Sequence, residues 1–180
     1  MSECQKGAKS MKIILNAGHT RSGAGTGAVG LLLESEESRK IVTLVKHYLR
    51  GKGHEVIIDN VDQAKSQGEY LKKITDYANK FDADMFVSVH FNAGGGHGSE
   101  CYTWKGRKTD QAVGVCAELN KLGFRNRGVK DGSRLFVIRN TKATALLIEV
   151  CFVDSKEDYN LYQKHGINKI AQAITRGILR

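Results

Sequence analysis

The run Val87-Ser88-Val89-His90-Phe91-Asn92-Ala93 is the stretch of sequence from which the fold is most readily inferred. It closes an apolar segment, residues 84–92, with the composition of a strand that is buried on both faces. The segment ends in His90 and Asn92, and a glycine-rich loop at residues 94–98 follows at once. In α/β proteins, polar residues at the carboxyl end of a buried strand commonly carry the chemistry. We therefore expect His90 to be one ligand of a bound metal.

Strand-like and helix-like segments alternate along the rest of the chain. Apolar, β-branched runs predict strands, and apolar residues at helical spacing predict helices. The predicted strands are residues 12–16, 55–59, 84–92, 100–104, 134–139 and 143–153, and the predicted helices are residues 34–50, 69–80, 109–122, 155–163 and 167–179. This alternation predicts an α/β fold with a single three-layer domain, in which helices flank a largely parallel, twisted sheet of about six strands.

Length and composition indicate one globular domain. The chain has 180 residues, of which 41% are hydrophobic and 26% are charged, and it contains no proline and no linker-like segment. Met11 begins the first strand-like run, so we place the domain at residues 11–180 and treat residues 1–10 as a disordered or appended extension. That extension lacks the apolar core of a secretory signal, and no run of about 18 apolar residues predicts a membrane span. We therefore expect synthesis in the cytoplasm and no membrane insertion.

The net charge and the cysteines restrict the possible partners and metal sites. The net charge of +9 favours an anionic partner. The basic residues are spread along the chain, however, and do not distinguish a nucleic acid from a membrane surface or a polyanionic cell wall. The four cysteines form no C-x-x-C pair, which argues against a zinc knuckle or a redox motif. Cys116 and Cys151 lie in apolar surroundings and are expected to be reduced core residues.

Two further residues are expected near His90. His19 follows the first predicted strand, and the carboxyl ends of parallel strands share one edge of a sheet, so the two histidines should converge. A catalytic zinc takes three protein ligands and leaves its fourth position to water. Glu34, which follows a glycine-rich loop and opens a helix, is the candidate for the third ligand. Taken singly, each histidine also fits a surface residue, and Glu34 also fits an acid that stabilises a helix N-terminus.

Glu149 stands within residues 143–153, the most apolar run of the chain. Burying a carboxylate among aliphatic side chains costs several kcal/mol unless the group is paired or its pKa rises. A raised pKa suits a general acid or base near neutral pH. A Glu paired with another buried group would instead be structural. The residues alone leave both interpretations open.

The glycines of the first long loop have the spacing Gly25-x-Gly27-x-x-Gly30. This spacing is also found in dinucleotide-binding loops, where the glycines form the tight turn between a strand and a helix. Here the glycines begin well after the predicted strand and precede a Leu-Leu-Leu run, which argues against a nucleotide site.

Together these residues resemble the Amidase_3 type of zinc-dependent N-acetylmuramoyl-L-alanine amidases, which includes phage endolysin catalytic domains and bacterial autolysins. The matching segments, in the family's order, are Ala17-Gly18-His19, Glu34, Ser88-Val89-His90-Phe91-Asn92-Ala93, Gly98-Ser99-Glu100 and Leu147-Ile148-Glu149-Val150-Cys151-Phe152. The resemblance implies that His19, Glu34 and His90 bind Zn²⁺. Glu149 would then be the catalytic acid and base. The reaction implied is hydrolysis of the amide bond between N-acetylmuramic acid and the L-alanine of the peptidoglycan stem peptide.

Some positions depart from the family's usual pattern. Asn16-Ala17 precedes the first histidine motif where the family often has Asp-Pro, Cys151 replaces a glycine, and Asp154-Ser155 replaces Ser-Asn. Glu36 and Glu37 are further carboxylates close to the assigned ligand. None of these differences removes a required chemical group.

The resemblance also implies a partner and a place of action. The partner would be Gram-positive peptidoglycan with its anionic polymers, reached after release through a holin or mother-cell lysis, and not a nucleic acid. Residues 94–98 are expected to line the cleft, and Trp104 or Tyr102 to pack on sugar, on peptide or in the core. Two alternatives stay open. One is a zinc carboxypeptidase or other metallo-amidohydrolase, and the other is a non-catalytic wall-binding module, which would not need a carboxylate in a buried strand.

Overall fold

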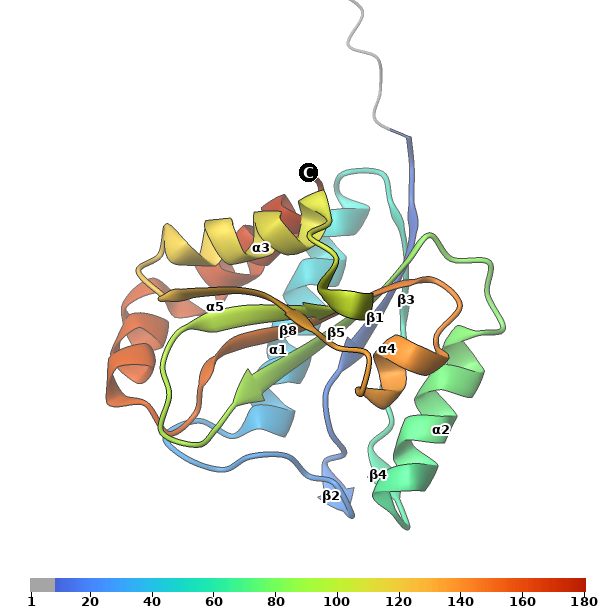
Figure 1. Ribbon diagram of the computed structural model, residues 1–180, viewed down its shortest axis with the longest axis horizontal. Coiled ribbons are helices and arrows are strands. Elements are labelled where there is room, and N and C mark those ends of the chain that lie inside the picture. The colour runs from blue at the N-terminus through green and yellow to red at the C-terminus, as the bar shows by residue number, and fades with distance from the viewer. Residues whose placement is uncertain (1–8) are drawn as a thin grey trace, which may run out of the picture.

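A six-stranded, mostly parallel sheet forms the centre of the molecule (Figure 1). The computed structural model describes residues 9–180, so residues 1–8 of the predicted extension lie outside the described part. In spatial order the strands are β3 (Glu55–Ile58), β1 (Lys12–Ala17), β5 (Met85–Asn92), β8 (Thr144–Phe152), β6 (Ser99–Thr103) and β7 (Asn126–Asp131). All neighbours are parallel except β8 and β6, which are antiparallel. A separate two-stranded sheet pairs β2 (Ser22–Gly23) with β4 (Gln63–Ala64).

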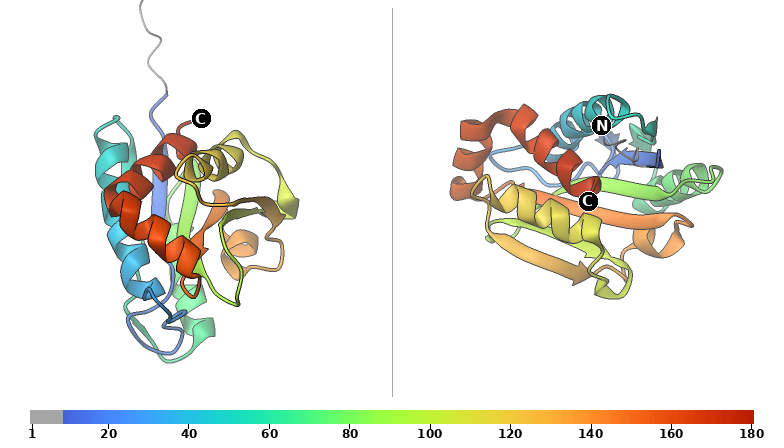
Figure 2. Two further views of the ribbon diagram at one scale, coloured as in Figure 1. Left: turned by 90° about the vertical axis from the view of Figure 1, so that its left-hand side faces the viewer. Right: turned by 90° about the horizontal axis from the view of Figure 1, so that it is seen from above.

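Helices cover both faces of the large sheet, as Figures 1 and 2 show. One face carries α1 (Glu34–Arg50), α3 (Asp110–Asn120) and α5 (Lys156–Ile178), and the other carries α2 (Gln67–Ala78) and α4 (Phe136–Asn140). A short 3₁₀ turn, η1 (Trp104–Gly106), follows β6. The predicted α/β class, a single domain with a six-stranded sheet flanked by helices, is confirmed.

The middle strands β1, β5 and β8 are apolar on both faces, which explains their central position. In β1, Ile13 and Leu15 belong to the core under α1, whereas Ile14 belongs to the core under α2. All three side chains are fully buried. Each such burial contributes about 1.5–3 kcal/mol to folding. This packing fixes the edge at which β1 and β5 end side by side.

Local sequence signals determine where the helices begin. Ser66, Thr109 and Ser155 are the N-caps of α2, α3 and α5, and the side chain of each accepts a backbone N–H three residues on. Gly166, at a φ of 69°, interrupts α5 and separates the two helices that the sequence predicts there. No helix within residues 9–180 combines the length and the apolar character needed to cross a bilayer.

The prediction of a strand at residues 134–139 is wrong. This run contains most of α4, and its Val137 and Ile138 are buried in the core under α2. The sixth strand is instead β7, which pairs only with β6 at the edge of the sheet. Its sequence, NRGVKD, is polar and largely exposed, so it lacks the apolar pattern by which a strand is recognised.

Candidate metal centre

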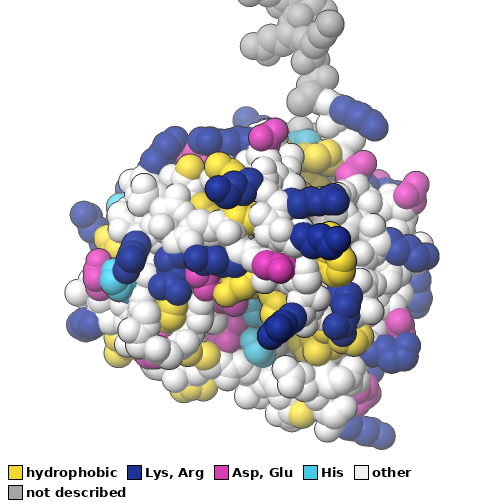
Figure 3. All heavy atoms as spheres, in the orientation of Figure 1, with side chains coloured by type: hydrophobic (Ala, Val, Ile, Leu, Met, Phe, Trp, Pro, Cys, Tyr) yellow, Lys and Arg dark blue, Asp and Glu magenta, His cyan; other side chains and the backbone are white. Residues whose placement is uncertain are grey.

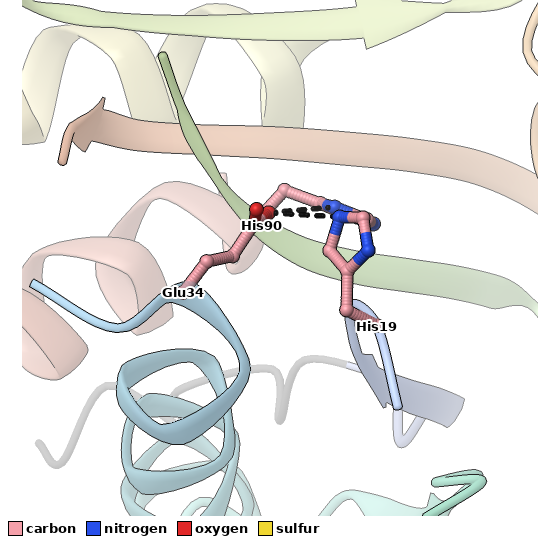
Figure 4. A group of neighbouring side chains, drawn as sticks. All are labelled: His19, Glu34 and His90. Atoms are coloured by element: carbon pink, nitrogen blue, oxygen red, sulfur yellow. Dashed lines mark hydrogen bonds and ion pairs between the residues drawn. The ribbon is translucent and has the colours of Figure 1, made fainter. Parts of the chain in front are cut away.

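Three side chains converge at the carboxyl edge of β1 and β5 (Figure 4). His19 comes from the loop after β1, Glu34 is the first residue of α1, and His90 lies near the end of β5. Glu34 Oε1 is 3.2 Å from His19 Nε2 and 3.1 Å from His90 Nδ1. One ligand atom from each residue lies within 4.8 Å of the other two. The structure therefore brings together the three residues predicted as metal ligands.

His19 is oriented by the loop that follows it. The residue has a φ of 68°, in the left-handed region, and its ring Nδ1 lies 2.9 Å from the Gly25 carbonyl oxygen. A carbonyl only accepts hydrogen bonds, so Nδ1 carries the proton and the lone pair of Nε2 faces Glu34. Metal-binding histidines typically have such a carbonyl partner on the second ring nitrogen.

His90 is oriented by a buried chain of hydrogen bonds. Its Nε2 lies 3.0 Å from Ser88 Oγ, and that hydroxyl donates to Asn16 Oδ1 at 2.7 Å. The Asn16 amide in turn donates to the backbone carbonyl of Asp59. With the Ser88 proton committed to Asn16, Nε2 of His90 is the donor and Nδ1 is left to face Glu34. Ser88 and Asn16 are fully buried. Burial also lowers the pKa of His90, which favours the neutral imidazole that a metal requires.

Glu34 is held on both carboxylate oxygens. Oε1 accepts the backbone N–H of Phe91 at 3.0 Å, and Oε2 accepts that of Ala28 at 2.8 Å. Burial would raise the pKa of Glu34, but the close approach of the His19 and His90 rings outweighs burial and holds the pKa well below its usual range. Glu34 is thus ionised. It is only 3% exposed, whereas an acid that merely stabilises a helix N-terminus would face solvent.

The other two acids of the first turn of α1 point elsewhere. Glu36 is 43% exposed and lies near Arg21, and Glu37 accepts hydrogen bonds from the Tyr162 hydroxyl and from Lys40. Among these three carboxylates, only Glu34 belongs to the cluster.

The glycines around the cluster leave room for its side chains. A Cβ on Gly18 would lie 2.4 Å from Cε1 of His90, and a Cβ on Gly27 would lie 2.8 Å from Oε2 of Glu34. Gly30 packs equally closely against the carbonyl oxygen of Val153. Of the three glycines whose spacing resembles a dinucleotide motif, Gly27 thus packs against Glu34 and Gly30 against Val153, while Gly25 meets no close neighbour and has a left-handed φ of 84°.

Glu149 lies in the same cavity as the histidines. The cavity has a volume of about 430 Å³, and both His19 and His90 line it with Glu149. Glu149 is the register partner of His90 in the pairing of β5 with β8. Its Oε2 is shielded from solvent and has no hydrogen-bond partner among residues 9–180. Burial, with a smaller contribution from the charges of Glu34 and Glu100, raises the pKa of Glu149 to about 8. This environment favours an acid–base role over a paired structural one.

Comparison with known proteins shows which family has this arrangement. The family model described as N-acetylmuramoyl-L-alanine amidase, Amidase_3, matches residues 13–180. The chain belongs to the Amidase_3 family. The resemblance predicted from the sequence is thereby confirmed.

Several known proteins are similar to this chain along most of its length. The endolysin of Bacillus phage SPP1 is 32% identical over 175 residues, which are 91% of this chain and 63% of that protein. The N-acetylmuramoyl-L-alanine amidase CwlM of Bacillus licheniformis is 31% identical over 175 residues, 94% of this chain and 68% of CwlM. The solved catalytic domain of the CD27L endolysin targeting Clostridia Difficile superposes with a TM-score of 0.87 at 32% identity, covering 94% of this chain and 97% of that domain.

Other relatives are much longer than this chain. An uncharacterized protein of Clostridium perfringens strain 13 is 30% identical over 176 residues, which are 93% of this chain. The chain spans about half, 51%, of the length of that relative.

The walls of the cavity in this Amidase_3 member differ from the sequence-based expectation. Residues 94–98 do not line it, because the backbone N–H groups of that loop bind the carboxylates of Asp154 and Asp158. Trp104 and Tyr102 do not line it either. β6 runs antiparallel to β8, which places the end of β6, and Trp104 after it, at the opposite edge of the sheet from the histidines.

The sequence analysis also missed several residues of the cavity wall. They belong to α2 and to the segment that leads into α4: Gln67, Tyr70, Leu71, Arg134, Leu135, Phe136 and Val137. They follow no strand end, so the rule that located the histidines does not apply to them. In the sequence, these residues show only that one side of a helix is buried. That they line the cavity becomes apparent only once the position of the helix over the cavity is known. Cys116 and Cys151 are buried free thiols, as predicted.

Proposed function

We propose that this protein is a zinc-dependent N-acetylmuramoyl-L-alanine amidase that hydrolyses the bond between N-acetylmuramic acid and the first L-alanine of the stem peptide. The observation that carries the proposal is the convergence of His19, Glu34 and His90 beside Glu149, whose Oε2 is shielded and unpartnered among the described residues. Membership of the Amidase_3 family supports it. The site combines a place for a Lewis acid with an acid–base group, which are the two requirements of metal-assisted amide hydrolysis.

The donor set fits zinc. Two imidazole nitrogens and one carboxylate oxygen are common ligands of catalytic zinc, and a three-ligand set leaves a position open for chemistry. His19 Nε2, Glu34 Oε1 and His90 Nδ1 are the atoms that would hold the ion. When bound, zinc supplies polarisation of a carbonyl and activation of a water. The carbonyl of Gly25 and the hydroxyl of Ser88 would hold the two rings in the required tautomers.

Glu149 is proposed to move the proton. Its carboxylate would take a proton from the attacking water and deliver it to the nitrogen of the departing L-alanine. A carboxyl whose pKa is near neutrality suits both halves of this transfer. The absence of a hydrogen-bond partner on Oε2 within residues 9–180 leaves that oxygen available.

The rest of the cavity is proposed to orient the substrate. Tyr70, Leu135 and Phe136 form an apolar wall, and Gln67 and Arg134 add polar groups at its margin. A mixed wall of this kind suits a stem peptide, which has methyl side chains as well as amide and carboxylate groups. We propose Gram-positive peptidoglycan as the substrate, and the release route through a holin or mother-cell lysis stays a prediction.

The products of wall digestion test the proposal. Purified Gram-positive peptidoglycan is digested with the zinc-loaded protein, and the soluble fragments are identified by mass spectrometry. The amidase proposal predicts intact stem peptides with a free L-alanine amine, and glycans with a free lactyl carboxyl group. Shortened stem peptides still attached to glycan would indicate a carboxypeptidase instead. If no new amines form, the protein is a binding module. The Glu149→Gln variant serves as the matched control, because it should stay folded and metal-loaded without releasing products.

A further inference from the structure

A second cavity lies across α4 from the cavity lined by His19, His90 and Glu149, which we call the catalytic cavity after the proposed function. The second cavity has a volume of about 380 Å³. Trp104 and Arg107, from the segment after β6, form one wall, and Arg139 and Thr141, from the end of α4 and the residue after it, form the other. The cavity does not contain His19, Glu34 or Glu149, so the proposed reaction leaves it without a role. We call it the distal cavity.

The distal cavity opens on the same face of the sheet as the catalytic cavity. Ala145 lines the distal cavity, while Leu147 and Glu149 line the catalytic one. These three residues alternate along β8, and alternate residues of a strand project from one face. Four residues of strand span about 13 Å, so the two cavities are close enough to be reached by one polymer.

The wall that carries Trp104 is built rigidly. Thr103 Oγ1 donates to the Arg107 carbonyl at 2.8 Å, which closes the turn around Trp104. The N–H of Lys105, at a left-handed φ of 54°, donates to Ser133 Oγ at 3.0 Å and ties the turn to the next segment. Trp104 is nevertheless 39% exposed. An aromatic side chain has few rotatable bonds, so a Trp on a fixed backbone turn loses little conformational entropy on binding.

Positive charge is concentrated around the distal cavity. Residues 104–109 contain three basic residues and no acidic one, and residues 130–142 contain four basic residues and one acidic one. These two segments account for most of the net charge of +9. Figure 3 shows Lys and Arg side chains gathered on the face over η1 and α4. No ion pair within residues 9–180 involves any of the seven basic residues: Lys105, Arg107, Lys108, Lys130, Arg134, Arg139 and Lys142.

Two arginine side chains line the distal cavity. Arg107 and Arg139 supply guanidinium groups, whose planar donor pattern matches phosphate oxygens. The cavity thus offers an aromatic side chain and two arginines to one ligand.

We propose that the distal cavity binds a phosphodiester-linked sugar or polyol polymer of the cell wall. The arginines would bind phosphate groups, and the Trp104 ring would pack on the apolar face of a sugar. A nucleic acid is the less suitable ligand, because surfaces that bind single strands stack successive bases on several aromatic side chains. Among residues 9–180, Trp104 is the only aromatic residue that lines this cavity. The proposal rests on the proposed function only in taking the wall as the place of action.

Binding at the distal cavity would keep the catalytic cavity close to its substrate. An anionic polymer attached to the same wall would act as a second attachment point and raise the effective concentration of scissile bonds. The expected kinetic effect is a lower KM on intact walls without a change in kcat. For a soluble stem-peptide fragment, which carries no such polymer, the distal cavity should have no effect on KM.

Wall binding by a non-hydrolysing protein tests this proposal separately from the reaction. The Glu149→Gln chain is mixed with insoluble Gram-positive walls, either intact or stripped of phosphodiester polymers with hydrofluoric acid, and the bound fraction is measured. We expect stripping to weaken binding about tenfold, since the charge-assisted contacts to phosphate are lost. Adding Arg107→Gln and Arg139→Gln should weaken binding to intact walls by a similar factor, and adding Trp104→Ala should weaken it further.

Matched controls decide whether this effect is specific. Lys164 and Lys169 are exposed on α5 and form no ion pair within residues 9–180, so Lys164→Gln with Lys169→Gln removes the same charge from another face. This control should bind intact walls like its parent, and thermal unfolding establishes that every variant is folded. Equal loss in the control and the arginine variant would overturn the proposal. So would equal binding to stripped and intact walls, or stronger competition by an oligonucleotide than by soluble poly(glycerol phosphate).

Discussion

Glu149 lies directly beside His90 in the parallel pairing of β8 with β5. Paired residues of neighbouring strands project from the same face, so this register brings Glu149 to the cavity that His90 lines. The two residues are 59 positions apart in the sequence and differ in their surroundings. His90 is held by Ser88 and Glu34, whereas the Oε2 of Glu149 is left free within the described part of the chain. This difference is the basis for proposing that His90 binds the metal and that Glu149 transfers the proton.

The hydrogen-bond chain behind His90 predicts a role for Ser88. The Ser88→Ala change removes the acceptor for His90 Nε2–H and leaves the ring free to rotate or to adopt the other tautomer. Loss of such a partner should weaken zinc binding about 10–100-fold. Competition with a chromogenic chelator measures this affinity. Ser99→Ala is the matched control, because Ser99 is equally buried and its hydroxyl has no partner among the described residues. Zinc affinity in Ser88→Ala equal to that of Ser99→Ala would show that the chain does not position the ligand.

The close approach of Gly18 to His90 predicts a steric effect. An alanine at position 18 would place its Cβ 2.4 Å from Cε1 of the ring, so the ring must move away from the cluster. We expect Gly18→Ala to lose most of its bound zinc and its activity while staying folded. Gly68→Ala on α2 is the control, because its Cβ would meet only Ser66 Oγ at 4.0 Å. Metal content and circular dichroism measure the two effects, and a fully metal-loaded Gly18→Ala protein would contradict the packing described here.

Asp59 predicts a pH-dependent stability. Burial raises the pKa of Asp59 to about 7, and its Oδ2 has no partner within residues 9–180. The unfolded state ionises near pH 4, so the free energy of unfolding should fall as the pH rises from about 4 to about 7. The Asp59→Asn change removes the free-energy cost of ionising this buried carboxyl in the folded protein. In urea unfolding, the Asp59→Asn variant should be about 1–3 kcal/mol more stable than the parent at pH 8, and the difference should disappear at pH 4. The exposed Asp82→Asn change should show no such pH-dependent gain, and a uniform effect of Asp59→Asn at both pH values would refute the assignment.

Arg134 predicts selectivity for anionic stem peptides. Its side chain lines the catalytic cavity and forms no ion pair among residues 9–180. Arg134→Gln should raise KM about two- to fivefold for soluble fragments with free stem-peptide carboxylates, the range expected for one exposed ion pair. Fragments whose stem carboxylates are amidated should show no change, and Arg134→Lys should largely retain the parent KM. The same increase on both kinds of fragment would mean that Arg134 does not bind carboxylate.

The metal cluster was predictable because it follows from topology. His19 and His90 stand at the ends of two apolar runs, and the parallel pairing of such strands leaves their carboxyl ends on one edge. The apolar neighbours of Glu149 singled it out as a buried carboxylate, but they left a paired structural role open beside an acid–base role. By contrast, the strand β7 and the helix α4 were confused, because a polar edge strand lacks an apolar pattern and a five-residue helix has too few turns to show periodicity.

Contacts between distant segments were not predictable. Ser88 and Asn16 share a register only because β1 pairs with β5, and nothing in their local sequence indicates a bond between their side chains. The position of Trp104 depended on the antiparallel direction of β6, which the alternation of strands and helices does not reveal. The distal cavity likewise arises where two separate basic segments meet in the folded chain.

Zinc content in two variants tests the central claim most directly. His90→Ala and Glu149→Gln are purified, dialysed against the same trace of zinc and analysed by mass spectrometry for metal per chain, with folding followed by circular dichroism. We expect about one zinc per chain in Glu149→Gln and almost none in His90→Ala, with neither variant hydrolysing peptidoglycan. Loss of zinc from Glu149→Gln, or full zinc in a folded His90→Ala, would contradict the division between a metal-binding cluster and a separate proton-transfer residue.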